Sequence, residues 1–136
     1  MPYLNVKLSV DSRPGLSRTI ARGLTQIAAE VLGKKPELTA VVVEYVPAVD
    51  WFIGATAAEA PAPRSFFLEI KITHGTNTKD EKALFVSRAW AFLDEVVGGA
   101  NPASYVVIDD LHADSWGYGG QTQEHRYVVA KSPPES

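Results

Sequence analysis

The sequence predicts an α+β fold in which two duplicated β-α-β units share one four-stranded mixed sheet, with two helices on one face. Three observations support this prediction: the chain repeats itself, each half has the pattern strand–helix–strand, and only two segments show strong helical periodicity. The two helices then cover one face of the shared sheet, which gives two packed layers. The 136 residues are enough for a single domain spanning 1–136.

The repeat is visible without any gap. The stretch 41–54, VVVEYVPAVDWFIG, aligns with 106–119, VVIDDLHADSWGYG. The first strands also match, LNVKL at 4–8 against LEIKI at 68–72, at an offset that differs by one residue. Because the matches are concentrated at core and turn positions, they predict an internal duplication.

The repeat also defines the organisation of the domain. The first β-α-β unit is expected at 2–58 and the second at 65–120. A linker rich in Ala and Pro joins them at 59–64, and a C-terminal tail follows at 121–136. The last seven residues, AKSPPES, are expected to be disordered because they are polar and rich in proline.

In the first unit, YLNVKLSV alternates apolar and polar residues, which is the period of a half-buried strand. The segment 11–15, DSRPG, supplies capping side chains and an early proline, so a helix is expected to start there. Gly33 is expected to end this helix, and AVVVEYV is the second strand. The predicted buried stripe is Leu16, Ile20, Leu24, Ile27 and Val31.

In the second unit, FFLEIKIT is the first strand and SYVVIDDL the last. The sequence TKDE at 78–81 has the Thr-x-x-Glu form of a capping box. The helix that follows is expected to end at Gly98 and Gly99. Its predicted buried stripe is Val86, Trp90, Leu93 and Val97.

Two helices on one face leave the other face of the sheet uncovered. That face is expected to carry many apolar side chains, and large exposed apolar patches mark interfaces, so we expect an oligomer. The segments DWFIGA and SWGYGGQ follow the second strand of each unit and combine aromatic residues with glycines. They are expected to form short hairpins that reach a neighbouring subunit.

The composition excludes several classes of function. A net charge of −3 gives no reason to expect nucleic acid or a membrane surface as partner, and no apolar run approaches the ~20 residues of a membrane span. The chain has no cysteine, and its start lacks the pattern of a signal peptide, so we expect a cytoplasmic protein. Neither a cofactor nor a metal is expected: Asp109 and Asp110 are adjacent on a strand and point to opposite faces.

Pro2 is the candidate catalytic residue. If Met1 is removed, the ring nitrogen of Pro2 becomes a free secondary amine instead of an amide. A free α-amine has a reference pKa of about 7.7–8.0, and burial or nearby cations lower it. Such an amine is well placed to take a proton from an acidic carbon and return it elsewhere. A proline at a strand start is otherwise an ordinary structural residue.

Together the Met-Pro start, the strand–helix–strand order and VVVEYVPAVDWFIG resemble the tautomerase superfamily, over about residues 2–120. The duplicated length and ADSWGYG are similar to its fused branches, which include macrophage migration inhibitory factor, malonate semialdehyde decarboxylase and cis-3-chloroacrylic acid dehalogenase. The resemblance implies a homotrimer without a cofactor and an N-terminal catalytic proline. The counterpart of Pro2 in the second half is near Phe66, inside the chain, so only the first half can offer a free proline nitrogen. The resemblance therefore implies one catalytic site per chain.

The resemblance also implies arginines that hold a carboxylate or carbonyl. Arg13 is the nearest match after the first strand, whereas Ala40 stands where 4-oxalocrotonate tautomerase has a second arginine. The fused branches carry an arginine pair before the second helix, where this chain reads THGTNTK, and the dehalogenase-type glutamate falls near Gly117. The candidate substrate-binding residues are therefore Arg13, His74, Asn77 and Glu37, with Trp51, Trp116 and Tyr118 as an apolar wall.

Three functional hypotheses follow. The first is a tautomerase, an isomerase whose Pro2 is the general base for keto–enol or 1,3-allylic proton transfer on a small carbonyl or 2-hydroxydienoate-type acid. The second is a trimeric ligand-binding or structural homologue without catalysis, in which Met1 is retained or the arginines are lost. The third is a hydratase, decarboxylase or dehalogenase that uses the same proline, and the absence of arginine from 74–79 argues against it.

Overall fold

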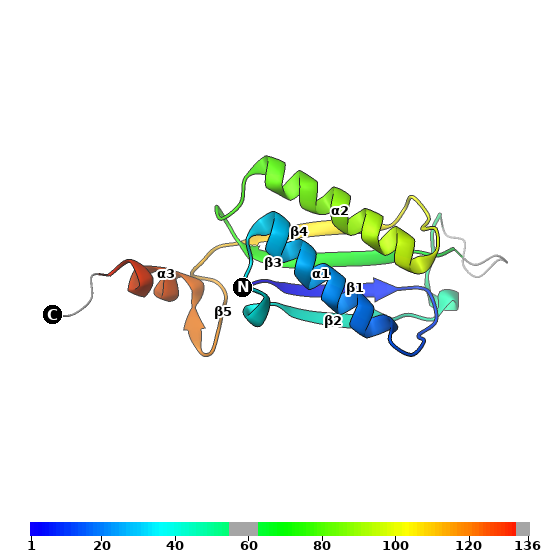
Figure 1. Ribbon diagram of the computed structural model, residues 1–136, viewed down its shortest axis with the longest axis horizontal. Coiled ribbons are helices and arrows are strands. Elements are labelled where there is room, and N and C mark those ends of the chain that lie inside the picture. The colour runs from blue at the N-terminus through cyan, green and yellow to red at the C-terminus, as the bar shows by residue number, and fades with distance from the viewer. Residues whose placement is uncertain (55–62, 133–136) are drawn as a thin grey trace.

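The computed structural model describes residues 1–54 and 63–132 and contains one four-stranded sheet (Figure 1). The strand order is β2-β1-β3-β4, with β1 and β2 parallel, β3 and β4 parallel, and β1 and β3 antiparallel. Both long helices lie on one face of this sheet, so the predicted mixed sheet is confirmed. The bounds are β1 Tyr3–Leu8, α1 Leu16–Leu32, β2 Ala40–Tyr45, β3 Phe66–Thr73, α2 Lys79–Val97 and β4 Tyr105–Leu111.

The register of the strands agrees with the sequence repeat. Leu4 pairs with Val41 in the first unit, and Leu68 pairs with Val106 in the second. The residues that the repeat aligns therefore occupy equivalent places in the two units, including the one-residue difference in offset. The common origin of the two units remains a prediction.

The core lies between the sheet and the two helices. Alternate residues of β1 and β3 are fully buried, as the period of two requires. The predicted stripe of α1 is confirmed, since all of its residues are buried. The stripe predicted for α2 is wrong by one position at its start: Val86 is exposed and Trp90 half-buried, and the buried residues are Phe85, Ala89, Leu93 and Val97.

The two helices start differently. The capping box predicted before α2 is present, because Thr78 accepts from the N–H of Glu81 and the Glu81 carboxylate accepts from the N–H of Thr78. Before α1, by contrast, neither Asp11 nor Ser12 caps the helix: Gly15 is the N-cap, at φ 81°, without a side-chain hydrogen bond. The Pro14–Gly15 turn delays the helix beyond the reach of those side chains.

Both helices end as predicted. Gly33 and Gly98 adopt the left-handed conformation at the C-caps, where residues with a Cβ are strained. After Gly33 the chain forms a short 3₁₀ turn, η1 (Pro36–Leu38), and then enters β2. The segment from 34 to 39 therefore connects the end of α1 to the start of β2.

The segments after the two units differ. After the second unit, β5 (Gly117–Tyr118) and β6 (Gln121–Thr122) form the predicted hairpin. After the first unit, the described residues form a 3₁₀ turn, η2 (Ala48–Asp50), and one bridge at Ile53. The rest of that expected hairpin and most of the linker lie outside the described residues.

A third helix, α3 (Gln123–Lys131), follows the β5–β6 hairpin and projects from the end of the sheet (Figure 1). Its first turn is capped by Thr122, whose hydroxyl accepts from the N–H of His125. The start of AKSPPES was expected to be disordered, but Ala130 and Lys131 are helical, and 133–136 lie outside the described residues.

The face of the sheet opposite the helices is mixed rather than uniformly apolar. Exposed or half-buried aromatic and aliphatic residues are present there, among them Tyr105, 59% exposed, and Val42, 39% exposed. Polar pairs lie between them: Asn5 donates to Glu44, and Lys71 forms an ion pair with Asp109 at 3.0 Å that raises the pKa of Lys71. Among the described residues, no helix is long and apolar enough to cross a membrane.

Candidate functional site

Pro2 lies at the end of the sheet where β1 and β2 begin and β3 and β4 end. It is almost completely buried. Its carbonyl accepts a hydrogen bond from the N–H of Ala40 at 3.2 Å, which extends the β1–β2 ladder by one residue. Pairing with β2 therefore fixes the backbone of Pro2, and burial removes its ring from solvent.

The chain start is partly buried and lies near two lysines. Burial lowers the pKa of the Met1 amine, and the charges of Lys34 and Lys35 lower it further. Glu37, one of the predicted site residues, acts in the opposite direction. An amine at this end of the sheet thus holds its proton less firmly than an amine in water.

Lys34 is a site residue that the sequence reasoning missed. Its side chain is half-buried, and burial is the main reason that its pKa is lowered. Its Nζ donates to the hydroxyl of Thr76 at 3.1 Å. Two sequence signals together locate it: Gly33 ends α1, and the six residues that follow must return the chain to β2 beside Pro2.

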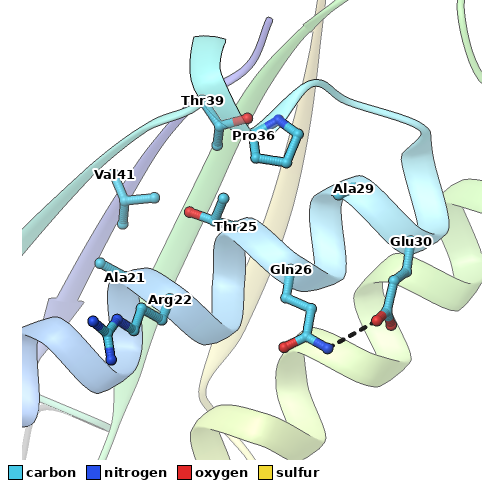
Figure 2. A pocket seen from close by; sticks show the side chains of 9 residues that line it. All are labelled: Ala21, Arg22, Thr25, Gln26, Ala29, Glu30, Pro36, Thr39 and Val41. Atoms are coloured by element: carbon cyan, nitrogen blue, oxygen red, sulfur yellow. Dashed lines mark hydrogen bonds between the residues drawn. The ribbon is translucent and has the colours of Figure 1, made fainter.

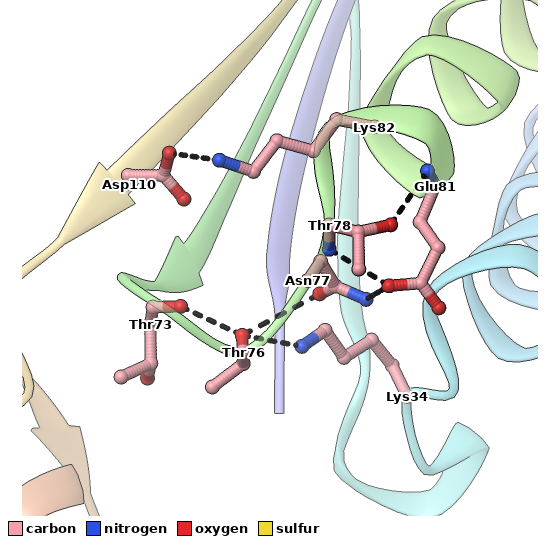
Figure 3. Close-up of polar contacts among 8 residues, drawn as sticks. All are labelled: Lys34, Thr73, Thr76, Asn77, Thr78, Glu81, Lys82 and Asp110. Atoms are coloured by element: carbon pink, nitrogen blue, oxygen red, sulfur yellow. Dashed lines mark hydrogen bonds and ion pairs between the residues drawn. The ribbon is translucent and has the colours of Figure 1, made fainter.

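The loop between β3 and α2 forms a second wall of this end of the sheet (Figure 3). The Thr76 hydroxyl donates to the carbonyl of Thr73 at 2.7 Å, which closes the turn. The predicted site residue Asn77 donates to the carbonyl of Leu32 at 3.0 Å, so its amide attaches the loop to the end of α1. Lys82 and Asp110 form an ion pair behind the loop.

The structure places most of the predicted site residues at the same end as Pro2. Glu37 is on η1, and His74 is exposed on the β3–α2 loop. The indole Nε1 of Trp116 donates to the hydroxyl of Thr73, the last residue of β3, at 3.1 Å. Tyr118, on β5, lines a cavity together with His74.

Arg13 and Trp51 are separated from these residues within one chain. Arg13 follows the carboxyl end of β1, and Trp51 follows the carboxyl end of β2. Because β1 and β2 are parallel and each has six residues, these positions are about 20 Å from the end that holds Pro2. A single chain therefore does not bring Arg13 and Trp51 to Pro2.

A cavity of about 540 Å³ lies between the β3–α2 loop, β5 and α3. Arg126 lines it, with its guanidinium 3.7 Å from the centre of the Tyr118 ring and its Nη2 donating to the Tyr118 carbonyl at 2.9 Å. The sequence reasoning missed Arg126 because it assigned 121–136 to the tail. The residues that line the cavity are Thr73, His74, Gly75, Thr76, Ala113, Tyr118, Gln123, Glu124, Arg126 and Tyr127.

A second groove, of about 590 Å³, lies between α1 and the segment that leads into β2 (Figure 2). Small side chains of α1, Ala21, Thr25 and Ala29, face Pro36 and Val41 across it. None of the predicted site residues lines this groove. Within the described ranges, no group of three or more His, Cys, Asp or Glu side chains is placed to hold a metal ion.

Comparison with known proteins gives a family from the sequence and a shared fold from the structure. The family model described as "Tautomerase enzyme" matches residues 67–126. A probable tautomerase, K2, from Dickeya dadantii (strain 3937) is 31% identical over 55 residues, which are 40% of this chain and 82% of that protein. The chain belongs to the tautomerase family.

Two solved structures show how far the fold agrees. The structure titled "F6 fused 4-OT wild type asymmetric trimer" superposes with a TM-score of 0.80 at 20% identity, covering 91% of this chain and 98% of that one. A macrophage migration inhibitory factor-like protein from Entamoeba histolytica has a TM-score of 0.71 at 26% identity, covering 89% and 97%. The β-α-β tautomerase fold thus extends over both units.

Proposed function

We propose that this chain is a tautomerase whose catalytic base is the amine of Pro2, freed by removal of Met1. The observation that supports this most directly is the position of Pro2: it is buried, and Lys34 and Lys35 act on the amine at the chain start. We infer that the Pro2 amine, one residue further on, experiences the same burial and the same charges. Its neutral form is then more populated near neutral pH than that of an amine in water.

The proposed reaction is keto–enol or 1,3-allylic isomerisation of a small carbonyl compound or 2-hydroxydienoate-type acid. The Pro2 nitrogen takes a proton from carbon or from an enol hydroxyl and returns it to the other end of the same system. No atom is gained or lost, so the reaction needs no cofactor. Lys34, which acts on the amine at the chain start, is our candidate cation for the oxygen on which negative charge develops, and its partial burial would strengthen that interaction.

We further propose that the working form is a homotrimer. The mixed apolar and polar face opposite the helices is the surface that an interface would cover. Within a single chain Arg13 and Trp51 are far from Pro2, and a neighbouring subunit is the route by which they reach it. The fused 4-OT structure of the same fold is described as a trimer, which is consistent with this proposal.

The first experiment is an intact mass of the purified protein combined with a phenylpyruvate ketonisation assay. The proposal expects a mass that lacks Met1 and a turnover that requires Pro2. The matched variant is Pro2→Ala, which keeps a free amine but loses the ring. A mass that retains Met1, together with no turnover, would instead support the ligand-binding homologue, since the nitrogen of Pro2 would then be an amide.

A further inference from the structure

The cavity between the β3–α2 loop and α3 contains a pair of unsatisfied donors. Among the described residues, the buried side-chain nitrogen and oxygen atoms without a hydrogen-bond partner are Nε of Arg126 and Nε2 of Gln123. Both residues line this one cavity. Buried polar groups in proteins are nearly always paired with protein, water or a ligand, so two such donors on residues that line one cavity are consistent with an acceptor bound there.

The chemistry of the two donors narrows the ligand class. The guanidinium of Arg126 is a planar cation whose N–H groups match the two oxygens of a carboxylate. Gln123 adds a neutral N–H that fits the same acceptor. The Tyr118 ring lies against the guanidinium at 3.7 Å and, with the bond from Nη2 to the Tyr118 carbonyl, holds it in one orientation.

The cavity adjoins the surroundings of Pro2. Thr76 lines the cavity, and its hydroxyl accepts from Nζ of Lys34, which acts on the amine at the chain start. The β3–α2 loop is therefore a wall shared by the cavity and the proposed catalytic end.

We propose that Arg126, assisted by Gln123, binds the substrate carboxylate. This rests on the proposed tautomerase function and adds a specificity-determining residue to it. The positively charged group that binds the substrate is then on α3, the helix that follows the second unit. It takes the place of the arginines that are absent from 74–79. Glu124 also lines the cavity and opposes an anion, so it limits the affinity.

The kinetic test compares an acid with a neutral substrate. Arg126→Gln should raise the KM for phenylpyruvate about tenfold or more, because hydrogen bonds to charged groups are the strong ones, and leave kcat nearly unchanged. The neutral methyl ester of phenylpyruvate should not be affected. Gln123→Met removes an N–H that no protein group accepts, and it should raise the KM for phenylpyruvate a few-fold. Arg126→Lys keeps the positive charge, so its KM should rise less than that of Arg126→Gln.

The matched control is Arg88→Gln, on the outer face of α2, where the arginine pairs with Glu30 at 2.8 Å. It should leave the KM for both substrates unchanged. An Arg126→Gln enzyme with an unchanged KM for the acid would overturn the proposal. Equal losses for the acid and the ester would also overturn it, because they would show that Arg126 only supports the fold.

A binding measurement separates this inference from the proposed function. In a ¹H–¹⁵N NMR spectrum of the full chain, the Nε–Hε signal assigned by its loss in Arg126→Gln should shift when benzoate is added. That shift supports the carboxylate site even if wild-type protein turns over neither substrate, in which case only the tautomerase proposal fails. An unchanged Arg126 signal at saturating benzoate would overturn the site.

Discussion

The two β-α-β units have the same fold but differ at their ends. The difference at the first strand concerns the proposed function, and the difference at the helix start concerns stability. Pro2 begins the first unit at the chain start, whereas its counterpart near Phe66 is locked inside the chain and packs edge-on against Trp90 with ring centroids 5.7 Å apart. The first unit has a helix without a side-chain cap, and the second has a complete capping box. The chemistry is thus expected in the first unit, and the better-defined helix start is in the second.

The ends of the units diverge further after their last strands. The first continues into η2 with exposed Val49 and Phe52, 60% and 63% exposed, while the second continues into a hairpin and α3. Apolar side chains in the first case favour contact with another subunit. In the second case the added elements close a cavity beside the proposed catalytic end. Two units of the same fold therefore provide different surroundings for one proposed site.

The sharpest test of the comparison substitutes the equivalent first positions of the two units. Pro2→Ala keeps a primary amine but loses the ring that positions it, so kcat/KM is expected to fall by up to about 10²–10⁴-fold, the contribution of a positioned general base, with little change in stability. Phe66→Leu should leave kcat/KM nearly unchanged. It should lower the free energy of unfolding by a fraction of the ~3–5 kcal/mol that Phe→Ala costs. Kinetics and urea unfolding of both variants measure the two effects. Similar changes in the two variants would contradict the division between units.

A second test removes the cation beside the chain start. Only the neutral amine acts as a base, so kcat/KM should rise with pH through the pKa of the Pro2 amine. Lys34→Gln removes a charge that lowers this pKa, so the acidic limb of the profile should move to higher pH and the rate should fall several-fold. Lys131→Gln, on α3, is the charge-matched control and should leave the limb in place. An unmoved limb in Lys34→Gln would exclude Lys34 from tuning the base.

A third test concerns the capping box of the second unit. Thr78→Ala should lower the free energy of unfolding by about 1 kcal/mol, the usual cost of losing an N-cap. The backbone N–H and the hydroxyl of Thr78 hold the pKa of Glu81 below its usual range. The contribution of the box is therefore present at neutral pH and declines as the pH falls and Glu81 is protonated. Urea unfolding of the variant and the wild type at neutral and acidic pH checks both statements.

The smallest effect is expected at the matching place in the first unit. Ser12→Ala should change the free energy of unfolding by less than about 0.5 kcal/mol, since α1 starts at Gly15 and no side chain caps it. The same unfolding measurement serves for this variant. A loss as large as that of Thr78→Ala would mean that Ser12 caps α1 in solution and that the two units are more alike than the structure shows.

The sequence by itself determined the local features of this protein. Alternation of apolar residues located the strands, the i, i+3, i+4 stripe of α1 identified its buried face, and Gly33 and Gly98 marked the helix ends. These signals depend on residues close together in the chain, so they can be read without a structure. The error at Val86 and Trp90 arose because two neighbouring stripes of α2 are both apolar, and only packing on the sheet selects one.

Only the tertiary structure decided which residues meet at the site. Lys34, Thr76 and the chain start come together because β1 pairs with both β2 and β3, and such long-range pairing has no local signature. The same pairing placed Arg13 and Trp51 at the far end of the sheet. Arg126 became a candidate only when α3 closed a cavity over the β3–α2 loop, since a short helix after a hairpin has too few apolar residues to be recognised from periodicity.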